Sequence, residues 1–118
     1  MRISIFFVLT FFLTSTTNAE WKSFHKDELG ISYFDTTTIK KHKSKLYLEV
    51  LTDYFIPQSN YRILSVISSE IVDCNNNLWN VQLTTLFKEP MGRGKPSNSL
   101  NPNMGWHQLT DREKKFCD

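Results

Sequence analysis

The sequence predicts one small domain of the α+β class, mainly β, with a short C-terminal helix packed on one face of its sheet and held there by a disulfide bond. Three observations lead to this prediction. Residues 46–55 and 61–74 carry apolar side chains at the two-residue spacing of β-strands. Residues 110–113 form a pattern that starts helices, close to the end of the chain. The chain has two cysteines, Cys74 at the end of the longer strand segment and Cys117 just after the helix start.

Residues 1–19 are predicted to be a secretory signal peptide. Arg2 gives a positive start, and residues 3–13 form a largely apolar run of eleven. A short stretch of small polar residues follows and ends in Ala19, which is typical of a cleavage site before Glu20. A membrane anchor is the alternative, but eleven residues make a helix only about 16 Å long, whereas a span needs about 20 residues.

The mature domain is therefore expected to span residues 20–118 and to lie in the periplasm or be secreted to the cell surface. No cysteine follows the leader directly, so no lipid-attachment site is predicted, and no stable membrane insertion is expected after cleavage. Apolar residues make up 40% and charged residues 22% of the chain, as in globular domains. The formal net charge of +2 falls to +1 when Arg2 is lost. A net charge this small excludes a general electrostatic affinity for nucleic acid. Electrostatic recognition of a partner would need a local patch of charged side chains.

Export would bring Cys74 and Cys117 into an oxidising compartment, where an even cysteine count usually means a bridge. Chain-entropy reasoning gives a bridge of this span a contribution of about 4 kcal/mol to stability. The alternatives are a metal pair and a free nucleophilic thiol. Zinc is the weaker interpretation, because the two cysteines are far apart and no histidine stands at ligand spacing from them.

The first part of the mature chain predicts a hairpin followed by a basic turn. Residues 21–24 and 31–34 are apolar-rich runs separated by the turn-like residues 26–30. Asp35 can cap a single helical turn after the second run. Residues 40–45 include four lysines and a histidine and are interpreted as a solvated turn, with contact to an anionic surface as the alternative.

Three long strands are predicted to form the centre of the sheet. The first covers residues 46–55 and is expected to be broken by residues 56–60, which include a proline. Residues 61–74 are apolar on both sides, as expected for a central strand covered on both faces. Residues 75–77 make an asparagine turn, and residues 78–88 return. The side chains assigned to one face of this last strand are Trp79, Val81, Leu83 and Phe87.

The remainder is predicted to form a loop, an edge segment and a helix. Residues 90–103 contain three prolines and two glycines and are expected to be mainly a long loop, with room for one short edge strand. Residues 104–107 are a further edge segment. Thr110 and Glu113 form a capping box, from which a helix of about two turns runs toward the second cysteine. Such a short helix is unstable alone, so we attribute its persistence to the bridge.

No arrangement of reactive side chains points to catalysis, a metal site or a cofactor. The three histidines lie in separate segments without a second ligand type nearby. Residues 92–97 are not a phosphate-binding loop, because Pro96 stands at the hydroxyl position and lacks an N–H. The serines of residues 61–74 lack the sharp turn that exposes a nucleophile. Three carboxylates are interpreted as polar residues on strand faces: Asp53, Glu70 and Asp73.

The basic loop after the last long strand is the candidate binding site. Rigid scaffolds commonly place binding residues on such loops, and Trp, Tyr and Arg dominate the energetics of contact surfaces. The alternatives are a solvated loop and aromatic rings that only fill the core. The candidate residues are Lys88, Arg93, Lys95 and Trp106.

The chain resembles the surface-adhesin protein E family of Gram-negative bacteria over nearly all of its mature length. The resemblance is carried by residues 33–39, by the strand end Asp73–Cys74, and by Trp106 ahead of the near-terminal Cys117. None of these is a catalytic signature. The resemblance implies a single antiparallel sheet of about six strands, with the C-terminal helix fastened to it by the disulfide.

The resemblance also implies a binding role. The family's named member is an adhesin that engages host extracellular-matrix proteins and can form homodimers. That adhesin carries a lipid anchor, for which this chain lacks the cysteine. We therefore expect a non-enzymatic, exported binding domain with a protein partner. Two alternatives stay open: a periplasmic enzyme inhibitor or envelope accessory protein that uses residues 88–103, and a small hydrolase.

Overall fold

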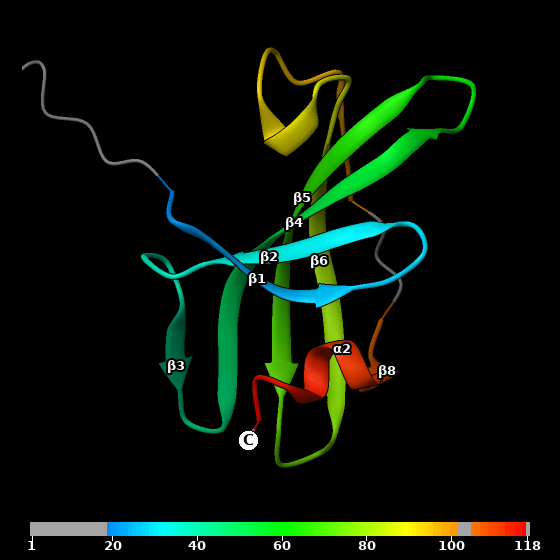
Figure 1. The fold of residues 1–118 in the computed structure, drawn as a ribbon. Helices are drawn as coiled ribbons and strands as arrows, with labels where there is room; N and C mark the ends of the chain where they lie inside the picture. Colours follow the sequence, from blue (N-terminus) through cyan, green and yellow to red (C-terminus); the bar gives the residue numbers. More distant parts are fainter. Residues whose placement is uncertain (1–18, 102–104, 118) are drawn as a thin grey trace, which may run out of the picture.

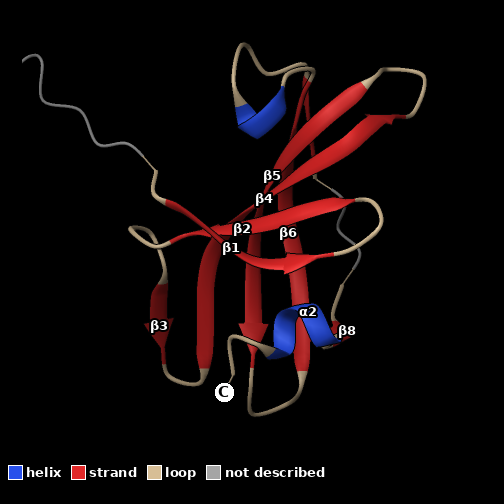
Figure 2. Cartoon of the chain, viewed as in Figure 1, coloured by secondary structure: helices blue, strands red, loops and turns tan. Residues whose placement is uncertain are grey.

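The computed structural model describes residues 19–101 and 105–117, so the predicted signal peptide lies outside the described residues except for Ala19. The described chain forms one antiparallel sheet with the main strand order β1-β2-β4-β5-β6-β7 (Figure 1 and Figure 2). The 3₁₀ helix η1 (Pro90–Gly92) and the α-helix α2 (Asp111–Lys114) accompany it. The strands are β1 (Trp21–Lys26), β2 (Gly30–Asp35), β3 (Lys40–His42), β4 (Lys45–Gln58), β5 (Ile63–Asp73), β6 (Leu78–Phe87), β7 (Asn98–Leu100) and β8 (His107–Gln108).

This architecture confirms the predicted α+β class, but the sheet has eight strands and not about six. Two short strands lie off the main path: β3 pairs with β4, and β8, which overlaps the predicted edge segment at His107, pairs with β6. The prediction that residues 40–45 are a turn is wrong for most of their length, because β3 pairs with the first residues of β4. Only Lys43 and Ser44 turn. Lys43 has a φ of 57°, and such positive φ values are what two-residue hairpin turns require.

β1 and β2 form the predicted N-terminal hairpin. Its turn is held by Asp27, whose carboxylate accepts the N–H groups of Leu29 and Gly30 at 2.9 and 3.2 Å. Gly30 is required where β2 meets β4, because a Cβ atom at this position would lie 2.1 Å from the carbonyl oxygen of Asp53. Close packing of two backbones therefore fixes the residue type at the start of β2.

Asp35 caps a turn at the end of β2, as predicted, although the turn is not helical. Its Oδ1 atom accepts the N–H and the hydroxyl of Thr37 at 2.9 and 2.7 Å. The same oxygen accepts the N–H of Glu20 at 3.1 Å. The first residue of the predicted mature domain is thus tied to the end of β2.

β4 and β5 are the longest strands and lie in the middle of the sheet. The prediction that residues 56–60 break the first of them is wrong, because β4 runs to Gln58. Its pairing with β5 is interrupted between Asp53 and Gln58. Pro57, which has no N–H to donate, lies within this unpaired stretch and is therefore tolerated. β5 carries buried side chains on both faces, which confirms the predicted central strand.

β6 differs from the prediction in the side chains that share a face. A register shift against β5 leaves Gln82 as an extra residue between Val81 and Leu83. An extra residue of this kind reverses which face the following side chains occupy. Leu83 and Phe87 therefore lie on the face opposite Trp79 and Val81, and the prediction that all four share one face is wrong.

The main core lies between α2 and one face of the sheet (Figure 1). Three rings close it: Phe24 of β1, Phe34 of β2 and Phe116 after α2 have centroids 4.6 to 5.9 Å apart. This arrangement confirms the prediction that the C-terminal helix packs on one face of the sheet. The buried apolar members of the core are Leu48, Val50, Val72 and Leu109.

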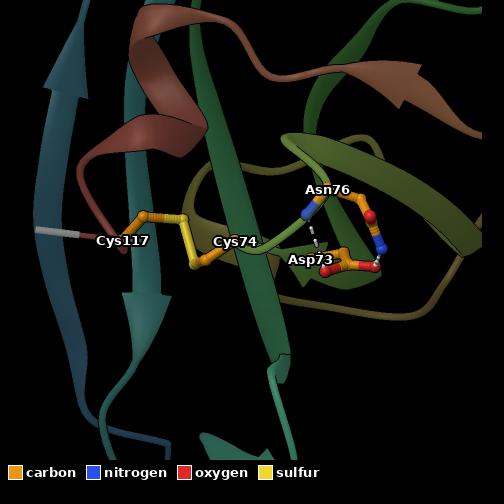
Figure 3. Close-up of a disulfide and its surroundings, with 4 residues drawn as sticks. All are labelled: Asp73, Cys74, Asn76 and Cys117. Carbon is orange, nitrogen blue, oxygen red and sulfur yellow. Dashed lines mark hydrogen bonds between the residues drawn. A yellow bond between two sulfur atoms is a disulfide. The ribbon is translucent and has the colours of Figure 1, made fainter.

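A disulfide bond joins Cys74 to Cys117, as predicted, with the two Cα atoms 5.5 Å apart (Figure 3). Both cysteines pack against the main core. The helix is shorter than predicted, with four residues, and begins with the predicted capping box of Thr110 and Glu113. A helix of this length cannot persist through its own hydrogen bonds. Its place is therefore set by the disulfide and by its contacts with the sheet.

Candidate binding surface

The β4–β5 hairpin projects at the upper right of the view (Figure 1), and exposed apolar side chains lie near its tip. Phe55, Ile56 and Tyr61 are 52, 65 and 73% exposed. Leu29, also exposed, lies beside the hairpin, because the Phe55 N–H donates to the Leu29 carbonyl oxygen at 2.9 Å. Gathered apolar side chains of this kind on a small domain mark surfaces that bind other molecules.

The tip is shaped by a turn over residues 59–62. The Ser59 hydroxyl oxygen accepts the N–H of Tyr61 at 3.1 Å, and its carbonyl oxygen accepts the N–H of Arg62 at 3.2 Å. Ser59 and Arg62 have φ values of 62° and 57°. Asn, Asp and glycine adopt this region more readily than other residues, so the turn depends on its hydrogen bonds. The result is a short turn that leaves Tyr61 and Arg62 exposed.

The part of the predicted binding loop that precedes β7, residues 88–97, is fastened to the sheet beside this hairpin. The Asp53 carboxylate accepts the N–H of Met91 at 2.8 Å. The fully buried Ser65 hydroxyl accepts the N–H of Gly92 at 2.8 Å and donates to the Glu89 carbonyl oxygen at 2.6 Å. Two polar residues of the central strands thus hold the loop backbone in one position.

At Gly92 the loop backbone packs closely against apolar side chains of the sheet. Its φ is 63°, and a Cβ atom there would lie 2.7 Å from Cδ1 of Ile67 and 3.1 Å from Cδ1 of Leu51. Only glycine fits both this backbone conformation and this close approach. The loop therefore covers the sheet face opposite α2, while the side chains of Lys88, Arg93 and Lys95 stay exposed.

A groove joins the hairpin tip to the far end of the loop. It has a volume of about 390 Å³ and lies between Tyr61, Ser97 and the strand β7. Tyr61 of the tip and Ser97 of the loop thus lie on the same groove. We call residues 55–62 together with residues 88–97 the hairpin–loop surface. The groove is lined by Tyr61, Ile63, Leu86, Ser97, Asn98 and Leu100.

The structure does not bring all four predicted binding residues together. Lys88, Arg93 and Lys95 lie on the loop that follows Phe87, at the hairpin end of β6. Trp106 precedes β8, which pairs with the opposite end of β6. About eight residues of extended strand separate the two ends, or roughly 26 Å. Trp106 instead makes a cation–π contact with Lys45, whose Nζ atom lies 5.5 Å from the ring centroid.

A buried charged cluster beneath α2 is a site that the sequence interpretation missed. Glu70 of β5 and Glu113 of α2 are 5 and 2% exposed. Arg112 lies between them, with its Nη2 atom 3.5 Å from Glu70 Oε2 and its Nη1 atom bonded to Glu113 Oε2. Its Nε atom donates to the Ser32 hydroxyl at 3.3 Å, and its guanidinium stacks on the Phe24 ring. Glu70 is thus a buried partner of the helix and not merely a polar residue on a strand face.

Burial raises the pKa of Glu70 to about 7; the Arg112 charge opposes this rise and the nearby Glu113 charge adds to it. The ordinary pKa of this carboxyl is 4.5. Between these two values the folded protein binds more protons than the unfolded chain. Stability from this group is therefore fully present below about pH 4.5 and is lost as the pH rises through about 7.

We expect Glu70→Gln to flatten this pH dependence. The neutral amide avoids the cost of burying a charge and can still accept a hydrogen bond from Arg112. The variant should therefore be more stable than the wild type at pH 8, by at most about 3 kcal/mol, and no more stable at pH 4.5. Urea unfolding at a series of pH values measures the effect, and the exposed Glu28→Gln is the charge-matched control. An unchanged slope between pH 5 and pH 8 in Glu70→Gln would contradict the assignment.

The serines of β5 have structural partners. Ser65 holds the loop, Ser68 bonds to Thr84 at 3.2 Å, and Ser69 donates to Glu49 at 2.8 Å. Within residues 19–101 and 105–117, no group of three or more His, Cys, Asp or Glu residues is arranged to hold a metal ion. In the same part of the chain, no helix has the length and apolar character needed to cross a bilayer.

Comparisons with known proteins place the chain in a family. It matches the family described as surface-adhesin protein E over residues 21–114. Its structure is similar to the crystal structure of protein E from non-typeable Haemophilus influenzae, with a TM-score of 0.51 and 15% sequence identity, covering 82% of this chain and 68% of that chain. At this identity the likeness shows a shared fold. A search of curated proteins finds no match. Because the family match extends from β1 to α2, the chain belongs to the surface-adhesin protein E family.

Proposed function

We propose that the chain is an exported, non-enzymatic binding domain that engages a protein partner through the hairpin–loop surface. The observation that carries this proposal is the projecting apolar tip, where Phe55, Ile56 and Tyr61 are more than half exposed. Membership of a surface-adhesin family supports a protein partner outside the cell. The proposal includes removal of residues 1–19 and release of the mature domain to the periplasm or the cell surface.

The composition of the surface suits contact with another protein. Protein interfaces combine an apolar or aromatic centre with a polar rim, and a few aromatic and arginine side chains carry most of their energy. Here the apolar tip is the centre, and the rim is basic: Arg62, Lys88, Arg93 and Lys95. The expected partner therefore offers an apolar pocket bordered by acidic residues. We propose host extracellular-matrix proteins as the partner class, with a second copy of the chain as a further partner.

The test is binding of the purified mature domain to vitronectin, laminin and plasminogen. In the double variant Phe55→Ser, Ile56→Ser, we expect the dissociation constant for the bound protein to rise at least tenfold, because anchors of this kind contribute about 2 kcal/mol each. Both side chains are exposed, so the variant should fold. Biolayer interferometry measures the affinity, and sedimentation of the same samples reports any dimer that the variant loses.

The control is Leu83→Ser, which removes a comparably exposed apolar side chain from β6. Its affinity should equal that of the wild type. The absence of saturable binding to all three proteins would remove the adhesin proposal. Equal losses in the control and the double variant would instead move the contact away from the hairpin.

The fixed loop also favours a second candidate, inhibition of a periplasmic enzyme. A loop whose backbone is already ordered loses little conformational entropy when it enters another protein's active site. This loop is held in place by Asp53 and Ser65. Co-purification with one periplasmic enzyme, lost on deletion of residues 88–97, would favour this candidate over adhesion.

A further inference from the structure

The β3–β4 hairpin carries a dense positive charge at the end of the molecule opposite the hairpin–loop surface (Figure 1). No acidic residue occurs between Asp35 and Glu49. Among residues 19–101 and 105–117, no carboxylate lies within salt-bridge distance of the lysines of this hairpin. Lysine-rich segments of this length are typical of binding sites for polyanions. The basic residues are Lys40, Lys41, His42, Lys43 and Lys45.

A carboxylate on the strand next to the hairpin is already engaged. Asp73 stands opposite Lys45 in the register of β4 and β5, and the attraction of Lys45 is a minor cause of its lowered pKa. The largest cause is the side-chain hydrogen bond from Asn76, and both Asp73 oxygens accept N–H groups of Asn76, at 3.3 and 2.8 Å (Figure 3). The positive charge of the hairpin is therefore available to interact with an external anion.

Two of these lysines border a cavity between the hairpin and the C-terminal segment. Its volume is about 470 Å³, within the usual range of ligand sites. The lining includes the cationic Lys41 and Lys43 and the neutral side chains of Ser44 and Asn75. The rest of the lining is apolar and consists of Leu46, Phe116 and the disulfide pair Cys74 and Cys117.

A lining that combines apolar side chains with lysines favours a ligand that has both an apolar face and anionic groups. The C–H faces of sugar rings supply the first feature, and sulfate groups supply the second. Successive side chains of an extended strand alternate between its two faces, but Lys41 and Lys43 both line this cavity, so a linear polymer with repeated charges can pair with these two lysines. We propose that the β3–β4 hairpin and its cavity bind a sulfated polysaccharide.

Other polyanions fit less well. A membrane-bound loop inserts apolar side chains among the lipids, but the turn of this hairpin consists of Lys43 and Ser44. Single-stranded nucleic acid needs open aromatic faces for stacking, but Phe116, the aromatic residue of the lining, already packs against Phe24 and Phe34. The sulfated polysaccharide site does not depend on the protein partner proposed above, because it lies at the other end of the molecule.

The test is isothermal titration of the mature domain with a heparin octasaccharide at several salt concentrations. The double variant Lys41→Ala, Lys43→Ala is expected to bind at least tenfold more weakly and to reduce the slope of log Kd against log salt by about one to two, because fewer counterions are released. Lys41→Arg, Lys43→Arg should keep most of the affinity. Lys88→Ala, Lys95→Ala is the control with the same change of charge at the opposite end, and its affinity should equal that of the wild type.

Each comparison ligand has one expected result, which is weak binding. The probes are the same octasaccharide without sulfate, polyglutamate, a single-stranded DNA oligonucleotide and vesicles of phosphatidylglycerol. Tight binding of any of these, or equal losses in the hairpin and control variants, would overturn the proposal. Unchanged heparin affinity in Lys41→Ala, Lys43→Ala would do the same, and matching thermal midpoints establish that all variants are folded.

Discussion

Cys117→Ser should lower the free energy of unfolding by about 4 kcal/mol and release the C-terminal segment from the sheet. The bond to Cys74 spans 43 positions of sequence, and a closed loop of that length restricts the unfolded chain by about this amount. The loss is large, because a domain of this size is usually stable by roughly 5 to 10 kcal/mol. Loss of the bond affects the helix α2 most directly, because a helix of four residues cannot form alone.

Urea unfolding under oxidising conditions measures the loss, and amide hydrogen exchange over residues 109–117 reports release of the helix. The double variant Cys74→Ser, Cys117→Ser is the control, since it leaves no free thiol to form intermolecular bridges. It should match the single variant and the reduced wild type. Equal unfolding midpoints for oxidised wild type and the double variant would show that the bond does not hold the helix.

Arg112→Leu is expected to cost about 3 to 5 kcal/mol at pH 8. Its guanidinium is the cation that bonds to both Glu70 and Glu113, which are almost completely buried. Removing the cation leaves buried carboxylate charges without a partner of opposite charge. The cost of these unpaired charges exceeds the net stabilisation by the intact ion pair. The cost should be smaller at pH 5, where Glu70 is protonated because burial has raised its pKa.

Urea unfolding at pH 5 and pH 8 tests this expectation. Lys114→Leu, on an exposed position of the same helix, is the control with the same change of charge and should alter stability little. Adding Glu70→Gln to Arg112→Leu should recover part of the loss, because the two sites interact directly. A loss no larger than that of Lys114→Leu, or one that is the same at both pH values, would contradict the role given to Arg112.

The elements set by local patterns were predictable from the sequence. The first hairpin, the two-sided central strand and the capping box at Thr110 all follow from residues close together in the chain, and all three are confirmed. The disulfide was predictable for a different reason, since two cysteines allow one pairing. Strand ends were less predictable. A lysine run has no alternating pattern and predicts a turn, although pairing with β4 makes β3 a strand.

Features that depend on contacts distant in sequence escaped prediction. Arg112 and Glu70 are 42 positions apart, and nothing local indicates that a carboxylate on a strand will meet a helix. The extra residue at Gln82 is equally invisible, because a bulge is decided by the neighbouring strand. Proximity in sequence suggests that Trp106 lies with the basic loop, whereas β8 pairs with the opposite end of β6. For the candidate site, the sequence indicated the loop but not the apolar hairpin tip beside it.

The contact between Asp35 and Glu20 bears on how the protein matures. In the precursor the Glu20 nitrogen is a neutral amide, 3.1 Å from a carboxylate that is 4% exposed. If a peptidase cuts after Ala19, as proposed, the same nitrogen becomes a terminal ammonium group and the hydrogen bond becomes charge-assisted, which makes it stronger. Removal of the leader would then fasten the start of β1 more firmly, so that the finished protein resists fraying at an end where its precursor is looser.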